Sequence, residues 1–175
     1  MKKFVFPGFS FRWRSSVVKV RPVAAKDVPA WVRITNEPEV FPWLLQPKKV
    51  TAASVAKRIL RNRDRRRLVV EKDGRVVGLL GFTPGFGRMS HTAEFFIAFS
   101  HSVHGSGIPF QVMKRCFARL KKQGIRLLHA GFNARNKRGQ RFYAKLGFKE
   151  YGALPKALKV GRNKFVDEVR IYKKL

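Results

Sequence analysis

Cysteine is almost absent from this chain of 175 residues, and acidic residues are few. The single cysteine, Cys116, excludes an intramolecular disulfide and a cysteine-ligated metal cluster, which fits a reducing compartment. The 4 histidines are too scattered to predict a metal site. No apolar run has transmembrane length, and residues 1–14 lack the apolar core and cleavage site of a secretion signal. We therefore expect a cytoplasmic protein with no metal and no membrane partner, and an organellar location stays open.

The charge, by contrast, is overwhelmingly of one sign. Lys and Arg number 39 against 10 Asp and Glu, which gives a formal net charge of +29. A surface this basic repels itself unless a polyanion neutralises it. Because the basic residues recur along the whole chain, the partner should touch several faces. We predict RNA, either ribosomal RNA on the ribosome or transfer RNA, with ribosomal proteins as further partners; a solvated basic surface is the alternative.

Two stretches hold the residues that we expect to contact RNA. One is the end of a predicted helix and the loop after it, whose alternative role is a solvated face. The other is the extension at residues 1–16, where aromatic and basic residues alternate and would suit an edge strand, packing onto the domain, or stacking on unpaired bases. The candidates are Arg12, Arg14, Lys57, Arg58, Arg61, Arg63, Arg65, Arg66 and Arg67.

Beyond that extension, residues 17–175 are expected to form one domain. A hydrophobic fraction of 45% with 16 phenylalanines is enough for one packed core. Apolar periodicity predicts the order β-α-α-β-β-β-α-β-α-β-β, which is a mixed α+β fold. The predicted helices are 24–36, 51–63, 108–123 and 137–146, and the predicted strands are 17–20, 92–99, 125–132, a hairpin over 68–82, and two after 148.

Two local patterns are especially informative. Asp73-Gly74 separates two β-branched runs, which predicts a hairpin with a type I′ turn. Further along, a strand end is followed by Gly105-Ser106-Gly107 and then by a helix. Free backbone N–H groups and the helix dipole converge at such a point, which favours an anion such as a diphosphate, although many such turns merely connect elements.

The segment from Asn136 to Phe148 makes the interpretation more specific. Asn136, a small residue at Gly139, Tyr143 and a Leu-Gly-Phe ending resemble the signature of the GNAT acetyltransferase superfamily, nearest in pattern to its ribosomal-protein N-terminal acetyltransferases. The glycine loop is similar to the pyrophosphate loop of that family. His104 stands where Arg or Gln is usual, and Pro109 lacks the amide of the usual small residue.

This resemblance implies a central, mostly antiparallel twisted sheet flanked by helices, with acetyl-CoA between splayed strands. Tyr143 would be the acid that protonates the departing thiolate, and Glu94, acting through water, the base. Packing is the alternative role of Tyr143, and an ion pair that of Glu94. The implied acetyl-CoA contacts are Phe99, His104, Gly105, Ser106, Gly107, Ile108 and Asn136.

Three functions are compatible with these features. The first is an acetyl-CoA-dependent N-acetyltransferase acting on an RNA-associated amine, either of a ribosomal protein or of an aminoacyl-tRNA. The second is a structural RNA-binding component of the ribosome that uses the acetyltransferase fold with a dormant site. The third is a toxin that acetylates charged tRNA. The acceptor amine and the oligomeric state are not determined by the sequence.

Overall fold

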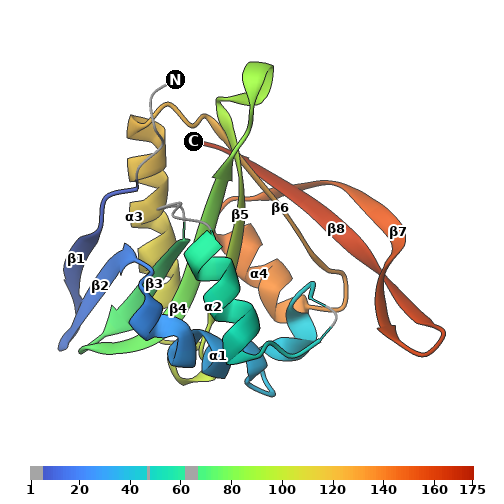
Figure 1. The fold of residues 1–175 in the computed structure, drawn as a ribbon. Coiled ribbons are helices and arrows are strands. Elements are labelled where there is room, and N and C mark those ends of the chain that lie inside the picture. The colour runs from blue at the N-terminus through green and yellow to red at the C-terminus, as the bar shows by residue number, and fades with distance from the viewer. Residues whose placement is uncertain (1–5, 47, 62–66) are drawn as a thin grey trace.

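A computed structural model describes residues 6–46, 48–61 and 67–175 (Figure 1). The long helices are α1 (Val28–Asn36), α2 (Ala52–Arg61), α3 (Ile108–Lys122) and α4 (Lys137–Lys145). The strands are β1 (Phe9–Trp13), β2 (Ser16–Pro22), β3 (Arg67–Lys72), β4 (Arg75–Pro84), β5 (Thr92–Phe99), β6 (Leu127–Asn133), β7 (Lys149–Gly161) and β8 (Lys164–Lys174).

From β2 onward the element order is the predicted one, and the α+β fold is confirmed. The hairpin of β3 and β4 closes through Asp73 and Gly74, whose φ angles of 49° and 80° are the positive values that a type I′ turn requires. Helix α1 begins four residues later than predicted, at Val28, because a short 3-10 turn (Ala25–Asp27) precedes it and a proline occupies its first turn.

The strands form one sheet in the order β1-β2-β3-β4-β5-β6-β8-β7. Neighbouring strands are antiparallel except for the pair β5 and β6, which is parallel. Figure 1 shows α1 and α2 on one face of the sheet and α3 on the other. Within the described residues, no helix combines the length and apolarity needed to cross a membrane.

Covering both faces creates two cores. On β3, Val69 packs into the core under α1 and α2, whereas its neighbours Leu68 and Val70 belong to the larger core on the α3 side. All three side chains are buried because successive residues of a strand point to opposite faces. Continuous apolar runs in β3 and β4 therefore follow from a sheet covered on both sides.

The aromatic N-terminal stretch packs against the domain. Strand β1 pairs with β2 as the first strand of the sheet, and Phe6 is completely buried. The guanidinium groups of Arg119 and Arg115, both on α3, lie 3.8 Å and 4.0 Å from the ring centroids of Phe9 and Phe11. These rings are therefore engaged within the protein, where cation–π contacts add to apolar burial.

Candidate functional site

The sheet opens between its two parallel strands. Strands β5 and β6 pair from Thr92 to Glu94 only, opposite Leu127 to His129. Beyond that point, β5 continues to Phe99 and β6 to Asn133 without pairing to each other. Backbone polar groups at this opening are left to a ligand or to water, because strands satisfy them by pairing.

A cavity of about 610 Å³ fills the opening and reaches both faces of the sheet. Its wall on the α1 side is mostly apolar and aromatic, and its wall on the α3 and α4 side combines the glycine loop with the start of α4. Sequence reasoning missed most of the apolar wall, although the aromatic run after α1 was visible as a loop. The residues of that wall are Trp31, Val40, Trp43, Leu44, Leu45 and Phe96.

The loop between β5 and α3 presents free backbone amides. Gly105 and Gly107 have φ angles of 75° and 82°, in the left-handed region that glycine adopts without strain. Among the described residues, the N–H groups of these glycines and of Phe110 have no hydrogen-bond acceptor. The N–H groups of His104, Ser106 and Ile108 are used inside the loop. Amides that converge at a helix N-terminus form an anion site, with fewer donors than the sequence implied.

Trp13 of β1 supports this loop from outside. Its indole N–H donates to the carbonyl oxygen of Ser106 over 3.0 Å. A β-carbon placed on Gly107 would lie 3.0 Å from the same indole ring, so the ring packs directly on the glycine backbone. The edge strand thus helps to hold the amides of the loop in place, a contact that local sequence patterns did not reveal.

His104 is held neutral beside the loop. Its Nε2 lies 3.0 Å from the carbonyl oxygen of Phe99 and donates to it, which leaves Nδ1 as an acceptor. Nδ1 is buried and has no partner among the described residues. Burial, followed by the charge of Arg138, lowers the pKa of His104. In this form the side chain brings no positive charge to the cavity that it lines.

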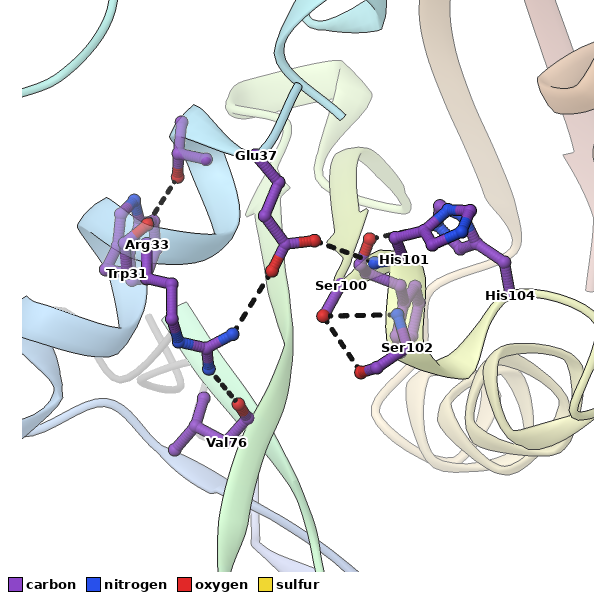
Figure 2. Close-up of polar contacts among 10 residues, drawn as sticks. Trp31, Arg33, Glu37, Val76, Ser100, His101, Ser102 and His104 are labelled. Carbon is purple, nitrogen blue, oxygen red and sulfur yellow. Dashed lines mark hydrogen bonds and ion pairs between the residues drawn. The ribbon is translucent and has the colours of Figure 1, made fainter. Parts of the chain in front are cut away.

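A carboxylate ties the end of α1 to the same region (Figure 2). Glu37 accepts a hydrogen bond of 2.7 Å from the backbone N–H of His101, just before the glycine loop. Its other oxygen pairs with Arg33 at 3.1 Å. On the opposite side, Arg138 of α4 donates to the carbonyl oxygen of Glu39 over 3.0 Å. The start of the turn after α1 is therefore bonded both to the segment before the glycine loop and to α4.

Asn136 begins helix α4. Its Oδ1 accepts from the backbone N–H of Gly139 over 2.8 Å, which makes it the N-cap. A β-carbon at Gly139 would come within 2.6 Å of the Asn136 Nδ2, so the small residue of the signature leaves room for the cap. Among the described residues the Nδ2 of Asn136 has no hydrogen-bond acceptor, and the residue lines the cavity.

Tyr143 lies on α4 within a cluster of aromatic rings. Its ring centroid is 5.4 Å from that of Phe132 and 5.9 Å from that of Phe148. Burial raises the pKa of Tyr143 to about 12, so its phenol is protonated at neutral pH. Its hydroxyl has no hydrogen-bond partner within the part of the chain that the structure describes, and the residue lines the cavity. Packing and proton donation are thus compatible here.

Glu94 stands where β5 and β6 separate. Its side chain is 54% exposed, and one oxygen lies 3.7 Å from Arg170 of β8. Glu168 also pairs with the Arg170 guanidinium, at 3.5 Å, so the single charge of Arg170 is divided between two carboxylates. At an exposed site a pair of this length is weak. The carboxylate therefore has only a weak ionic partner, and it lines the cavity.

The described candidates for RNA binding lie in two parts of the chain, on β1 and the turn after it and on α2 and the start of β3. Arg12, Arg14, Lys57 and Arg58 are exposed. Arg67 is half-buried and donates to the carbonyl oxygen of Arg58 over 2.9 Å. The other candidates cannot be placed: Arg61 ends α2 without a described side chain, and Arg63, Arg65 and Arg66 lie outside the described residues.

Comparison with known proteins agrees with this geometry. The pattern of the acetyltransferase (GNAT) family matches residues 28–148. A protein of Mycobacterium tuberculosis described as an uncharacterized N-acetyltransferase is 33% identical over 85 residues, which are 49% of this chain and 53% of that protein. The chain thus spans about half the length of the curated relatives that it matches.

Two solved structures illustrate the similarity of fold. A ribosomal-protein-alanine N-acetyltransferase from Brucella melitensis superimposes with a TM-score of 0.72 at 22% identity, over 89% of this chain and 99% of that chain. An acetyltransferase from Salmonella typhimurium, solved with acetyl-CoA, superimposes with a TM-score of 0.71 at 17% identity, over 90% and 94% of the two chains. Together, the family pattern and the split sheet show that the chain belongs to the acetyltransferase (GNAT) family.

Proposed function

We propose that this protein transfers the acetyl group of acetyl-CoA to an amine that is presented on RNA, either on a ribosomal protein or on an aminoacyl-tRNA. The observation that carries the proposal is the cavity at the split of β5 and β6, which joins the free amides of the glycine loop to Glu94 and Tyr143. Acetyl-CoA is bound by the Salmonella protein of the same fold.

The residues present fit acetyl-CoA. Its diphosphate would be held by the amides of Gly105, Gly107 and Phe110, which have no internal acceptor among the described residues. A side chain on either glycine would be strained at these φ angles. Its pantetheine arm would lie along β5 toward Phe99, where that strand has no partner on the β6 side. Asn136 and His104 line the same cavity.

Acetyl-CoA supplies an activated thioester carbonyl, to which the amine nitrogen bonds as the carbon–sulfur bond breaks. The amine must lose a proton and the sulfur must gain one. We assign the Glu94 carboxylate as the base, which accepts the proton of the amine through water. The Tyr143 phenol, whose pKa of about 12 keeps it protonated, donates the second proton.

The charge of the molecule supports an RNA-bound acceptor. A net charge of +29 raises the local concentration of polyanions and their association rate. The similarity to the Brucella ribosomal-protein-alanine N-acetyltransferase points to a ribosomal protein as one source of the amine. A primary amine held near RNA is consistent with both features.

A titration with acetyl-CoA followed by acetylation of whole ribosomes and of charged tRNA tests this function. We expect saturable acetyl-CoA binding and a mass increase of one acetyl group on one class of acceptor. Binding without transfer to either class would refute the assignment of the acceptor. Failure to bind acetyl-CoA, together with stable association with one ribosomal subunit, would instead identify a structural RNA-binding protein on this fold.

The contact between Trp13 and the loop predicts a selective effect on acetyl-CoA. Trp13→Phe keeps an aromatic ring but loses the bond to Ser106, so we expect the KM for acetyl-CoA to rise about 3-fold to 10-fold with kcat unchanged. Phe11→Leu is the control, because Phe11 lies on the same strand and its ring stacks on Arg115 of α3. Equal KM changes in both variants would indicate a general effect of β1.

A further inference from the structure

The hairpin of β7 and β8 extends beyond the body of the domain (Figure 1). Strand β7 is the last strand of the sheet and is exposed along nearly its whole length. Four large apolar side chains of this hairpin face solvent: Tyr151 at 58%, Leu154 at 56%, Val160 at 46% and Phe165 at 47% exposure. Exposed apolar residues gathered on one element indicate an interaction surface.

The outer part of the hairpin is rich in basic residues. Residues 154–165 carry Lys156, Lys159, Arg162 and Lys164, and the facing part of β8 carries Asp167 and Glu168. Among the described residues, none of these four basic side chains has an ionic partner. The charge on the arm is therefore available to an anionic partner.

The acidic residues of the hairpin have hydrogen-bond or ionic partners within the chain. Glu150 accepts a hydrogen bond from Gln140 over 2.9 Å. Asp167 accepts from the backbone N–H of Lys156 over 2.8 Å, and Glu168 pairs with Arg170 at 3.5 Å. Because these carboxylates have partners within the chain, the arm offers a partner mainly positive charge and apolar surface.

The edge of β7 is poorly suited to pairing with another strand. Register irregularities interrupt its ladder with β8 at Glu150/Gly152, Leu154/Leu158 and Lys159/Gly161. Pro155 removes a backbone donor, and Lys156 has a φ of 52°. Bulges, proline and lysine on an edge strand oppose the addition of a further strand. We therefore expect a partner to contact the side chains of the hairpin and not to add a strand to the edge of β7.

We propose that the β7–β8 arm, residues 151–165, binds unpaired RNA, with Lys156, Lys159, Arg162 and Lys164 on phosphates and Phe165 and Tyr151 on bases. Tyr151 is supported from behind by Tyr172, with ring centroids 5.9 Å apart. Exposed rings next to basic side chains match single-stranded RNA, whose bases can stack on aromatic side chains. The proposal deepens the proposed function, because it places the RNA contact that the acetyltransferase uses.

A charge-matched comparison tests the arm. Variant one carries Lys156→Gln, Lys159→Gln, Arg162→Gln and Lys164→Gln, and its control carries Lys48→Gln, Lys49→Gln, Lys121→Gln and Lys122→Gln, which are also exposed. Affinity for a single-stranded RNA is measured by fluorescence anisotropy across a range of salt concentrations. We expect the salt slope of the arm variant to fall by about 3, at about 0.7 per phosphate contact, and that of the control by less than about 1.

A second comparison isolates the aromatic contact. Phe165→Ala should weaken binding of single-stranded RNA about 10-fold and leave duplex RNA unchanged, because stacking needs unpaired bases. Phe86→Ala is the control, since Phe86 is 82% exposed in a different hairpin. Equal losses in the arm and control variants would overturn the proposal, and so would a change from dimer to monomer in sedimentation of the arm variant.

Acetyl-CoA affinity separates this proposal from the proposed function. The arm variant should bind acetyl-CoA as the unmodified protein does, because the cavity lies in the body of the domain and its lining includes no residue of β7 or β8. Lost acetyl-CoA binding in that variant would contradict the assignment of the arm to RNA. An unmodified protein that binds RNA through the arm but acetylates nothing would leave the arm in place and refute only the transfer reaction.

Discussion

Replacing Tyr143 with phenylalanine is expected to lower kcat for acetyl transfer by about 100-fold or more, the range of a lost general acid. The variant keeps the ring that packs against Phe132 and Phe148, so the fold should be retained. The affinity for acetyl-CoA should change little. Stopped-time assays of acetylated product and a separate binding titration distinguish the two quantities.

The control for this variant is Tyr172→Phe, which removes the hydroxyl of a tyrosine on β8 whose ring contacts Tyr151 and does not line the cavity. Its kcat should equal that of the unmodified protein. Because the pKa of Tyr143 is about 12, its ionisation should not depress the rate at any pH below about 11. An unchanged kcat in Tyr143→Phe would leave Tyr143 with a packing role only.

Asp27→Ala is expected to lower the free energy of unfolding by about 3 kcal/mol, since it removes a buried carboxylate that accepts charge-assisted hydrogen bonds from Arg21 and a further bond from a backbone N–H. Asp27 is 3% exposed and pairs with Arg21 through both oxygens, at 2.7 Å and 2.8 Å. It also accepts from the backbone N–H of Ala24 over 2.8 Å. Arg21 would keep Glu71 as an ionic partner and the carbonyl oxygen of Pro22 as an acceptor.

Chemical denaturation measures this difference. The matched control is Glu150→Ala, which removes the same charge but only an exposed hydrogen bond to Gln140, and should cost less than about 0.5 kcal/mol. A loss below about 1 kcal/mol in Asp27→Ala would mean that the Arg21 network adds little to stability.

The same carboxylate predicts how stability depends on pH. Burial opposes its charged form, but the hydrogen bonds from Arg21 and Ala24 outweigh burial and lower the pKa of Asp27. A lowered pKa in the folded state means that the unfolded state binds the proton more readily. The contribution is therefore complete above about pH 4 and is lost as the pH falls through the folded-state pKa. Acid unfolding of Asp27→Asn should show a smaller pH dependence in this range.

Much of the fold could be predicted from local patterns. The Asp73-Gly74 turn, the strand at residues 92–99 and the helix from Ile108 correspond to elements of the structure. Their signals are local, because turn φ angles, alternation and helical periodicity depend on neighbouring residues. The start of α1 was misplaced since a 3-10 turn and a helix share the same short-range pattern.

The candidate site was only partly predictable. The glycine loop and the Asn136 to Phe148 signature were identified, and the structure places Glu94, His104 and Tyr143 along one cavity. The apolar wall with Trp31 and Trp43 could not be predicted, because it depends on how the turn after α1 crosses the open sheet. It was equally impossible to predict that His101, Val103 and Ser106 accept hydrogen bonds from amides of the glycine loop. Hydrogen-bond partners of this kind depend on the folded backbone.

By itself, the sequence determined the family resemblance, the order of the elements and a surface of one charge sign, because each is a property of composition or of short-range spacing. Only the tertiary structure decided where β5 and β6 separate, that Trp13 supports a loop far along the chain, and that the β7–β8 arm stands free. These features arise from strand pairing and packing between distant segments, whose energies depend on which surfaces meet and not on local pattern.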